Sequence, residues 1–175
     1  MSSVLEAIEL ELLRKSFETF EEAYEMYNLY ALKVGFGTRK NRTRSKQNEV
    51  IGKDFICCKQ GFKSNKGKTN KAYTRLDIRT GCEAMMYIEY RKEADIWTVK
   101  EHRMLHNHPL IEPRECHRLR SHRKITTHDI DFLFTMKQSG IKIVEAVRVL
   151  KGINGGSLSV GFIPKDVYSL SLIHI

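Results

Sequence analysis

The spacing of four residues with metal-binding side chains constrains this chain more than any other feature. Cys57 is followed by 24 residues and then Cys82, and Cys82 by 23 residues and then His106, with His108 two positions later. Zinc takes four thiolate and imidazole ligands in a structural site, all of them from the protein. The pattern favours a zinc site, and ordinary polar surface is the competing interpretation because the short Cys-x-x-Cys motif is missing.

Strand alternation indicates which of two neighbouring cysteines is the better candidate ligand. Residues two apart in a strand face the same side, so His106 and His108 can converge on one ion. Cys57 and Cys58 face opposite sides, and Cys57 shares its side with the apolar Phe55. We therefore expect Cys57 to be the ligand.

The order of the apolar patterns predicts an α+β fold. Thr19 and Glu22 have the spacing of a capping box, and apolar residues at steps of three and four follow them. Beyond Phe36 the period becomes strand-like. The predicted elements are a helix at about 20–33 and four antiparallel strands at 37–46, 51–58, 74–90 with a possible break at Gly81, and 96–106. The residues between 59 and 71 are predicted to form an exposed loop.

Alternation within the third predicted strand defines the core face of the sheet. Cys82, Ala84, Met86 and Ile88 alternate with more polar residues. A short turn at 92–95 would bring Trp97 of the fourth strand over that face.

Helical spacing returns beyond Ile125. Thr126 and Asp129 cap one helix, Ser139 and Gly140 break it, and a second helix ends before Gly152. The two predict a helical hairpin. Because it carries few exposed basic residues, packing on the sheet or on a partner is favoured over the alternative, a helix-turn-helix that reads DNA.

Charge is concentrated in the middle of the 175 residues. Residues 1–38 carry three basic and seven acidic side chains, residues 39–124 carry 22 and ten, and residues 125–175 carry five and four. Such a basic region suits a polyanion such as nucleic acid, with a solvated surface of no particular purpose as the alternative. The densest part, 39–46, holds five basic side chains in eight residues.

Several classes of protein do not fit the sequence. No apolar run is long enough for a membrane span, and the first 15 residues do not resemble a signal peptide. The four cysteines are thus expected as thiols or metal ligands, not as a disulfide framework. Paired carboxylates, a Ser/His/Asp order and a Gly-rich phosphate loop are not found, so we expect neither an enzyme nor a small-molecule substrate. Cys116, His102, His117 and His122 lack ligand spacing and predict no second metal site.

A set of motifs resembles the DNA-binding domain of the plant far-red-impaired-response family, which belongs with the WRKY and glial-cells-missing zinc folds. The central motifs are FICCKQGF at 55–62, RTGCEA at 79–84, WTV at 97–99 and HNHPL at 106–110. The similarity extends from about 16 to 168 through FEEAY at 20–24, YNLYA at 27–31, VGF at 34–36 and LRSHRKI at 119–125.

The resemblance implies one structural Zn2+ held by Cys57, Cys82, His106 and His108, in a four-stranded WRKY-like sheet. It also implies that the strand at 37–46 enters the DNA major groove. Our choices for DNA contact are Arg39, Arg42 and Arg44 on base edges and Lys40 and Lys46 on phosphates.

The function that follows is a sequence-specific, zinc-stabilised transcription regulator in a plant nucleus, with light signalling as the family's theme. The alternative is a truncated interaction module that keeps the zinc fold and forms homo- or heterodimers without activating genes. The expected domains are a helical lead-in at 1–35, a zinc-binding DNA-binding domain at 36–112, and a basic linker with the hairpin at 113–175. In the family a transposase-derived domain follows, whereas residues 169–175 depart from the family pattern.

Overall fold

The computed structural model describes residues 13–62, 78–156 and 160–171. The chain forms two compact units, unit 1 at Met1–Ile111 and unit 2 at Glu112–Ile175. Each has its own hydrophobic core. Within the described ranges, no helix has the length and apolar character needed to cross a membrane.

Unit 1 is a five-stranded antiparallel sheet with the order β1-β5-β4-β3-β2. The strands are β1 (Ser16–Phe17), β2 (Thr38–Lys46), β3 (Glu49–Cys57), β4 (Met85–Arg91) and β5 (Ile96–Arg103). The prediction of four strands was wrong by one. Because β1 has only two residues, which pair with β5, it is too short for an alternating pattern to reveal it.

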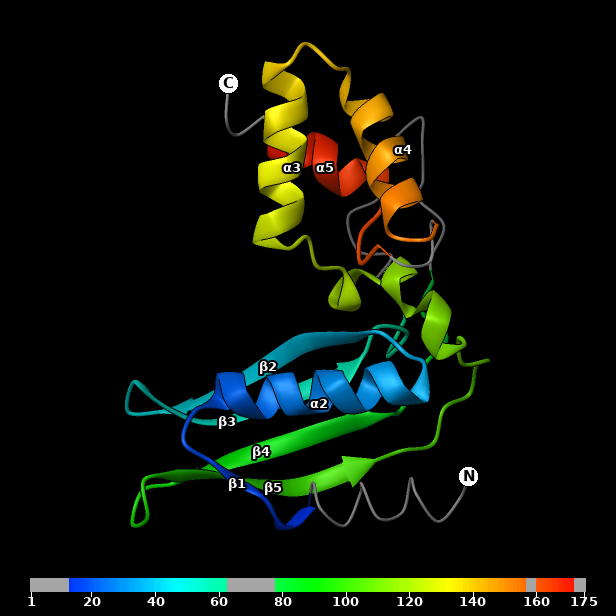
Figure 1. The fold of residues 1–175 in the computed structure, drawn as a ribbon. Helices are drawn as coiled ribbons and strands as arrows, with labels where there is room; N and C mark the ends of the chain where they lie inside the picture. The colour runs from blue at the N-terminus through cyan, green and yellow to red at the C-terminus, as the bar shows by residue number, and fades with distance from the viewer. Residues whose placement is uncertain (1–12, 63–77, 157–159, 172–175) are drawn as a thin grey trace, which may run out of the picture. The chain divides into compact units, whose positions relative to one another are not determined.

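Helix α2 (Phe20–Val34) lies across one face of this sheet (Figure 1). Thr19 caps it by accepting a hydrogen bond from the Glu22 backbone N–H at 3.1 Å. The helix ends at Gly35, whose φ of +101° is left-handed and where a side chain would collide with the Ile111 carbonyl. Its predicted apolar face is buried as Ala23, Tyr27, Tyr30 and Ala31.

The core of unit 1 lies between α2 and the sheet and follows the predicted alternation. Cys82, Ala84, Met86 and Ile88 are all buried, and Trp97 joins them from β5. Strand β4 is shorter than predicted, because residues 78–84 form a loop around the left-handed Gly81, with φ +74°. Two parts of the prediction lie outside the described residues: 63–71 of the predicted loop and 74–77 of the predicted third strand.

Unit 2 is helical. Two short 3-10 helices, η1 (Pro113–Arg118) and η2 (Arg120–His122), precede α3 (Thr127–Gln138), α4 (Ile143–Ile153) and α5 (Pro164–Ser171). The hairpin of α3 and α4 agrees with the prediction, but α4 continues through Gly152 to Ile153 and does not end before it. Helix α5 was not expected. The core is mostly aliphatic and contains Leu133, Ala146, Val147, Leu150, Val160, Phe162 and Val167.

Candidate metal centre and nucleic-acid interface

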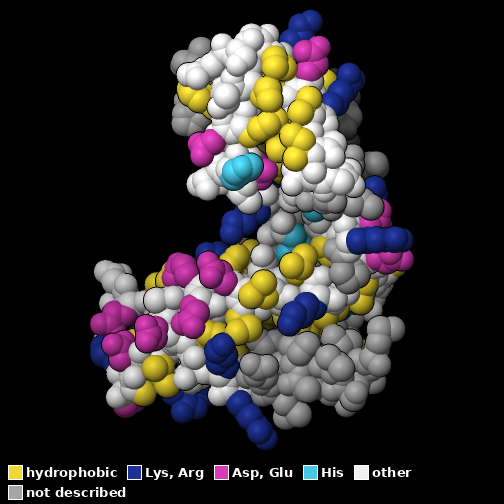
Figure 2. Space-filling view, viewed as in Figure 1, with side chains coloured by type: hydrophobic (Ala, Val, Ile, Leu, Met, Phe, Trp, Pro, Cys, Tyr) yellow, Lys and Arg dark blue, Asp and Glu magenta, His cyan; other side chains and the backbone are white. Residues whose placement is uncertain are grey.

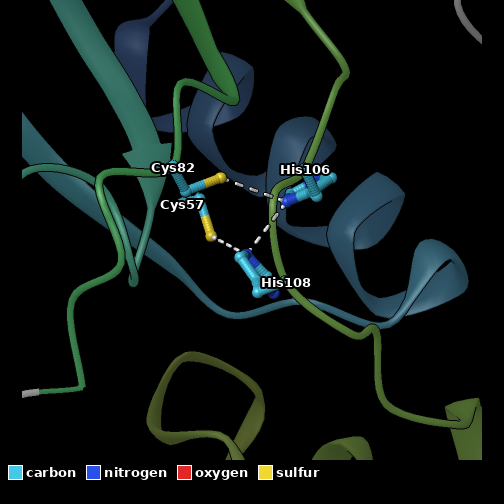
Figure 3. A group of neighbouring side chains, drawn as sticks. All are labelled: Cys57, Cys82, His106 and His108. Carbon is cyan, nitrogen blue, oxygen red and sulfur yellow. Dashed lines mark hydrogen bonds between the residues drawn. The ribbon is translucent and has the colours of Figure 1, made fainter.

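Four predicted ligands converge in unit 1. One ligand atom from each of Cys57, Cys82, His106 and His108 lies within 4.8 Å of the others (Figure 3). Cys57 Sγ is 3.2 Å from His108 Nε2, Cys82 Sγ is 3.4 Å from His106 Nδ1, and these two nitrogens are 3.2 Å apart.

These separations match those of a tetrahedral zinc site. With Zn–N near 2.0 Å and Zn–S near 2.3 Å, tetrahedral angles place two nitrogens about 3.3 Å apart and a sulfur and a nitrogen about 3.5 Å apart. The three measured separations lie within a few tenths of an ångström of those values. Two thiols and two imidazoles in this arrangement can hold a metal ion.

The hydrogen bonding of His108 favours metal binding through Nε2. Its Nδ1 lies 3.0 Å from the Pro109 carbonyl oxygen, which can only accept, so Nδ1 carries the proton. The Nε2 lone pair then faces the other ligand atoms, which is the second-shell arrangement common for metal-bound histidine.

Burial and a hydrogen bond shift the pKa values of two residues in the cluster, His106 and Cys57. Burial lowers the pKa of His106 to about 4, with His108 and His102 contributing, and so keeps this imidazole neutral and able to bind metal. A hydrogen bond with Cys58, followed by burial, raises the pKa of Cys57. Metal binding at this thiol must therefore release a proton.

The backbone brings the ligands together differently from the prediction. The histidines lie beyond the end of β5, in an irregular segment, so strand alternation is not what makes them converge. Cys82 precedes β4 and forms an isolated bridge with Gln60. Cys57 is buried with Phe55 in the core, as expected, while Cys58 is only partly buried and lies outside the cluster.

Elsewhere in the described ranges, cysteines and histidines form no further group of three or more potential metal ligands. Cys116 is buried in unit 2, and its thiol donates to the Glu112 carbonyl at 3.7 Å. His102 packs against the rings of Tyr27 and Tyr30, with ring centroids 6.0 and 5.1 Å away.

The basic segment forms an exposed edge of the sheet. Strand β2 is the last strand in the sheet order, and every residue from 40 to 46 is exposed. It carries five basic and no acidic side chains, and a two-residue turn joins it to β3. Gln47 and Asn48 in that turn have φ of 51° and 65°, as in a type I′ hairpin. In contrast, acidic side chains gather over the start of α2 (Figure 2), where Glu21 and Glu22 lie in its first turn.

Three of the five basic side chains make contacts within unit 1. Arg39 donates to the Gln60 carbonyl at 2.8 Å, and Lys40 lies 4.8 Å from the centre of the Tyr24 ring. Arg44 lies 4.0 Å from the centre of the Tyr87 ring and 3.3 Å from an Asp54 carboxylate oxygen. Sequence reasoning missed these partners; Tyr87, an aromatic on the polar side of its strand, was the available signal.

The other two basic side chains, Arg42 and Lys46, have no hydrogen bond or ion pair with another described residue. Arg42 also lies in a β-bulge. Between the pairs Lys40–Phe55 and Thr43–Lys53, β2 has two residues where β3 has one. Bulges at sheet edges redirect side chains, so this irregularity presents Arg42 differently from its neighbours.

A family model described as the FAR1 DNA-binding domain matches residues 25–112. Among curated relatives from Arabidopsis thaliana, Putative protein FAR1-RELATED SEQUENCE 10 is 33% identical over 159 residues, covering 86% of this chain and 23% of the relative. Protein FAR1-RELATED SEQUENCE 5 is 31% identical over 156 residues, covering 86% and 20%. Protein FAR-RED IMPAIRED RESPONSE 1 is 32% identical over 149 residues, covering 81% and 18%.

The chain thus spans less than a quarter of the length of these relatives. No solved structure matches it significantly. These relatives confirm the resemblance drawn from the motifs, while the kinship with WRKY and glial-cells-missing folds stays a prediction.

Proposed function

Since the chain belongs to the FAR1 DNA-binding domain family, we propose that it is a nuclear, sequence-specific transcription regulator whose strand β2 enters the major groove of double-stranded DNA. The observation that carries this proposal is the exposed basic edge strand, which begins beside the Cys/His cluster. Thr38, the first residue of β2, pairs with Cys57 in the sheet.

The geometry of β2 suits groove binding. The major groove of B-DNA admits a two-stranded β-ribbon, and the β2–β3 hairpin is such a ribbon. As the edge strand of the described sheet, β2 has one side where no other described strand lies, so its side chains can approach a duplex. Its lack of acidic side chains favours close approach to phosphates.

The five basic residues divide into two proposed roles. Arg42, without partners among the described residues and placed in the bulge, is the best candidate for bidentate hydrogen bonding to guanine. Lys46 is the candidate phosphate contact at the hairpin end. Arg39, Lys40 and Arg44 keep their proposed contacts with DNA, but their partners within unit 1 also hold the strand in shape.

A single structural Zn2+ is the proposed cofactor, with Cys57, Cys82, His106 and His108 as its ligands. The ion would supply a cross-link between segments that are far apart in sequence. Because Cys57 pairs with Thr38, the first residue of β2, a metal ion held by Cys57 would also help to position the start of the basic strand.

Gel-shift titrations at two salt concentrations test the DNA-binding proposal. The preferred site is first obtained by selection from random duplexes. Arg42→Gln should weaken the binding free energy on that site by about 1–3 kcal/mol and reduce base specificity at one position. Lys46→Gln should weaken binding to all duplexes alike and lower the salt slope by about one. Lys137→Gln, in α3 of unit 2, is the matched control and should bind as wild type.

All of these variants should keep the metal, because none of the substituted residues is a ligand. Weak, sequence-blind binding by wild type and variants alike would refute the regulator proposal. The dimerising interaction module would then be the better description of the chain.

A further inference from the structure

Asn107, which separates the two histidine ligands, is joined to Thr80 by a pair of reciprocal hydrogen bonds. Asn107 Nδ2 donates to the Thr80 carbonyl oxygen at 2.8 Å, and Thr80 Oγ1 donates to Asn107 Oδ1 at 2.8 Å. Because the backbone carbonyl can only accept, the orientation of the Asn107 amide is fixed by this pair. We name the two residues the Thr80–Asn107 clamp.

On the Thr80 side, the clamp reaches both cysteine-bearing segments. The backbone N–H groups of Thr80 and Cys82 donate to the Lys59 carbonyl at 2.9 and 3.3 Å. Gly81 N–H donates to the Gly61 carbonyl at 3.0 Å. The loop before Cys82 and the turn after Cys57 are therefore already joined through their backbones.

On the histidine side, Met104 packs against the core that contains both cysteines, but hydrogen bonds to the cysteine-bearing segments are few among the described residues. Strand β5 ends at Arg103, before the histidines. Apart from the ligand atoms themselves, the clamp is the only hydrogen-bonded link from the segment 104–108 to either cysteine-bearing segment in the described part of the chain. Among the residues that the structure describes, Phe36 is the one aromatic ring outside the cluster that packs on His106, at 4.3 Å between ring centroids.

We infer that Thr80 and Asn107 are positioning residues that hold the two histidines at ligand distance from the two cysteines before a metal ion binds. This inference rests on the proposed zinc site and concerns how tightly that site binds. A preorganised site has less chain to order when the ion arrives, so its affinity is higher. Residues that support metal ligands commonly contribute about 10- to 100-fold in affinity.

The test is titration with Co2+ and then with Zn2+ in competition with a chelator. Thr80→Val, which keeps the side-chain shape, and Asn107→Ala should each bind both ions about tenfold more weakly than wild type. The double variant should be no weaker than Asn107→Ala, because that change already removes both hydrogen bonds, whereas Thr80→Val removes only the one donated by the hydroxyl. Thr80→Ser keeps the hydroxyl and should restore wild-type affinity. Thr43→Val and Asn41→Ala make the same chemical changes at exposed positions of β2 and should have no effect.

The visible absorption of bound Co2+ separates positioning from loss of ligands. Saturated Thr80→Val should keep the wild-type bands of a tetrahedral site with two sulfur and two nitrogen ligands, whereas Cys82→Ser should lose them. Unchanged affinity in Thr80→Val and Asn107→Ala would refute the clamp while leaving the zinc site intact. Equal weakening in Thr80→Ser and Thr80→Val would also refute it, because the hydroxyl would then be irrelevant. A wild-type chain that binds neither ion would instead overturn the zinc site itself.

Discussion

The two units of this protein have cores of different kinds. Unit 1 has an aromatic core with two buried cysteines beside the histidine pair, and its ligands come from positions 57, 82, 106 and 108. Unit 2 has a mostly aliphatic core made by helices close together in sequence, between Thr127 and Ser171. Contacts between distant positions carry a higher loop-closure cost. The comparison indicates that the metal cross-link we propose would matter where irregular segments must meet, and that apolar packing suffices where neighbouring helices meet.

Loss of a metal ligand tests this comparison most severely. Cys82→Ser should remove the bound zinc and unfold the sheet of unit 1, because metal binding of this kind contributes on the order of 10 kcal/mol. Zinc content and the near-ultraviolet signal of the buried Trp97 should both fall, and the helical signal should fall by the share of α2 while the share of α3, α4 and α5 persists.

The other cysteines provide the controls. Cys58→Ala and Cys116→Ala remove thiols outside the cluster and should retain one zinc per chain. If Cys57→Ser kept its full zinc content, Cys58 would replace it as the ligand or the site would have to be abandoned.

Truncation of a core side chain in unit 2 is the opposite experiment. Leu150 is 2% exposed, and Leu150→Ala should destabilise the helices by about 2–5 kcal/mol through lost burial and a residual cavity. Denaturant unfolding of the zinc-saturated protein should show an earlier transition in the helical signal, which includes α3, α4 and α5, and an unchanged transition in the Trp97 signal of unit 1. Ile153→Ala, at the end of the same helix, is the control: its side chain is 69% exposed and should contribute little. Zinc loss in Leu150→Ala would contradict the separation of the two cores.

The sequence predicted the regular parts of unit 1 well. The apolar face of α2 and the buried alternation from Cys82 to Ile88 agree with the structure, because a fixed period relates neighbouring residues. The family was predicted too, from several short motifs taken together. The metal cluster joins the same four residues that were named, although their role as ligands stays a prediction.

Features that depend on tertiary contacts were not predicted. The histidines converge from an irregular segment, and the Thr80–Asn107 clamp joins residues 27 positions apart. The β-bulge at Arg42 also breaks the alternation on which a strand prediction rests. The spacing of neighbouring residues in the sequence does not predict these three features, because each depends on contacts with a segment that is distant in the sequence.

The stability of unit 1 should depend on pH through His102, with a smaller effect than loss of a metal ligand. Burial lowers the pKa of His102 from its ordinary 6.5 to about 4. As the pH falls from 6.5 to 4, the unfolded chain binds a proton at this residue that the folded chain does not. Stability is therefore lost as the pH falls through this window, by at most about 3.5 kcal/mol, since one pKa unit corresponds to about 1.4 kcal/mol.

His102→Phe keeps an aromatic ring beside Tyr27 and Tyr30 and removes the titration. Unfolding of unit 1, followed between pH 4 and 7 by Trp97 fluorescence, should depend less on pH in this variant than in wild type. The pH dependence of unit 2 should be the same in both proteins. Identical slopes in unit 1 would show that His102 titrates normally and that acid acts through other groups.

The smallest expected effect concerns the caps of two helices, one in each unit. Thr126 and Asp129 form a complete capping box at α3: Thr126 Oγ1 accepts from Asp129 N–H at 3.1 Å, and the Asp129 carboxylate accepts from Thr126 N–H at 2.9 Å. At α2 only half of the predicted box forms, because the Glu22 carboxylate accepts from Glu18 N–H and not from Thr19. Removing either cap hydroxyl should cost about 1 kcal/mol.

Thr126→Ala should lower the unfolding midpoint of unit 2 alone, because the lost bond leaves a backbone N–H of α3 without its partner. Thr127→Ala is the matched control, since Thr127 is exposed in the first turn and is not the cap. Thr19→Ala should lower the unfolding midpoint of unit 1 alone. The proposed zinc ion also stabilises this unit. Each variant is measured by denaturant unfolding with both signals recorded, and zinc affinity is measured in parallel. A cap substitution in unit 2 that weakened zinc binding would mean that the two units share their stability, against the comparison drawn from their cores.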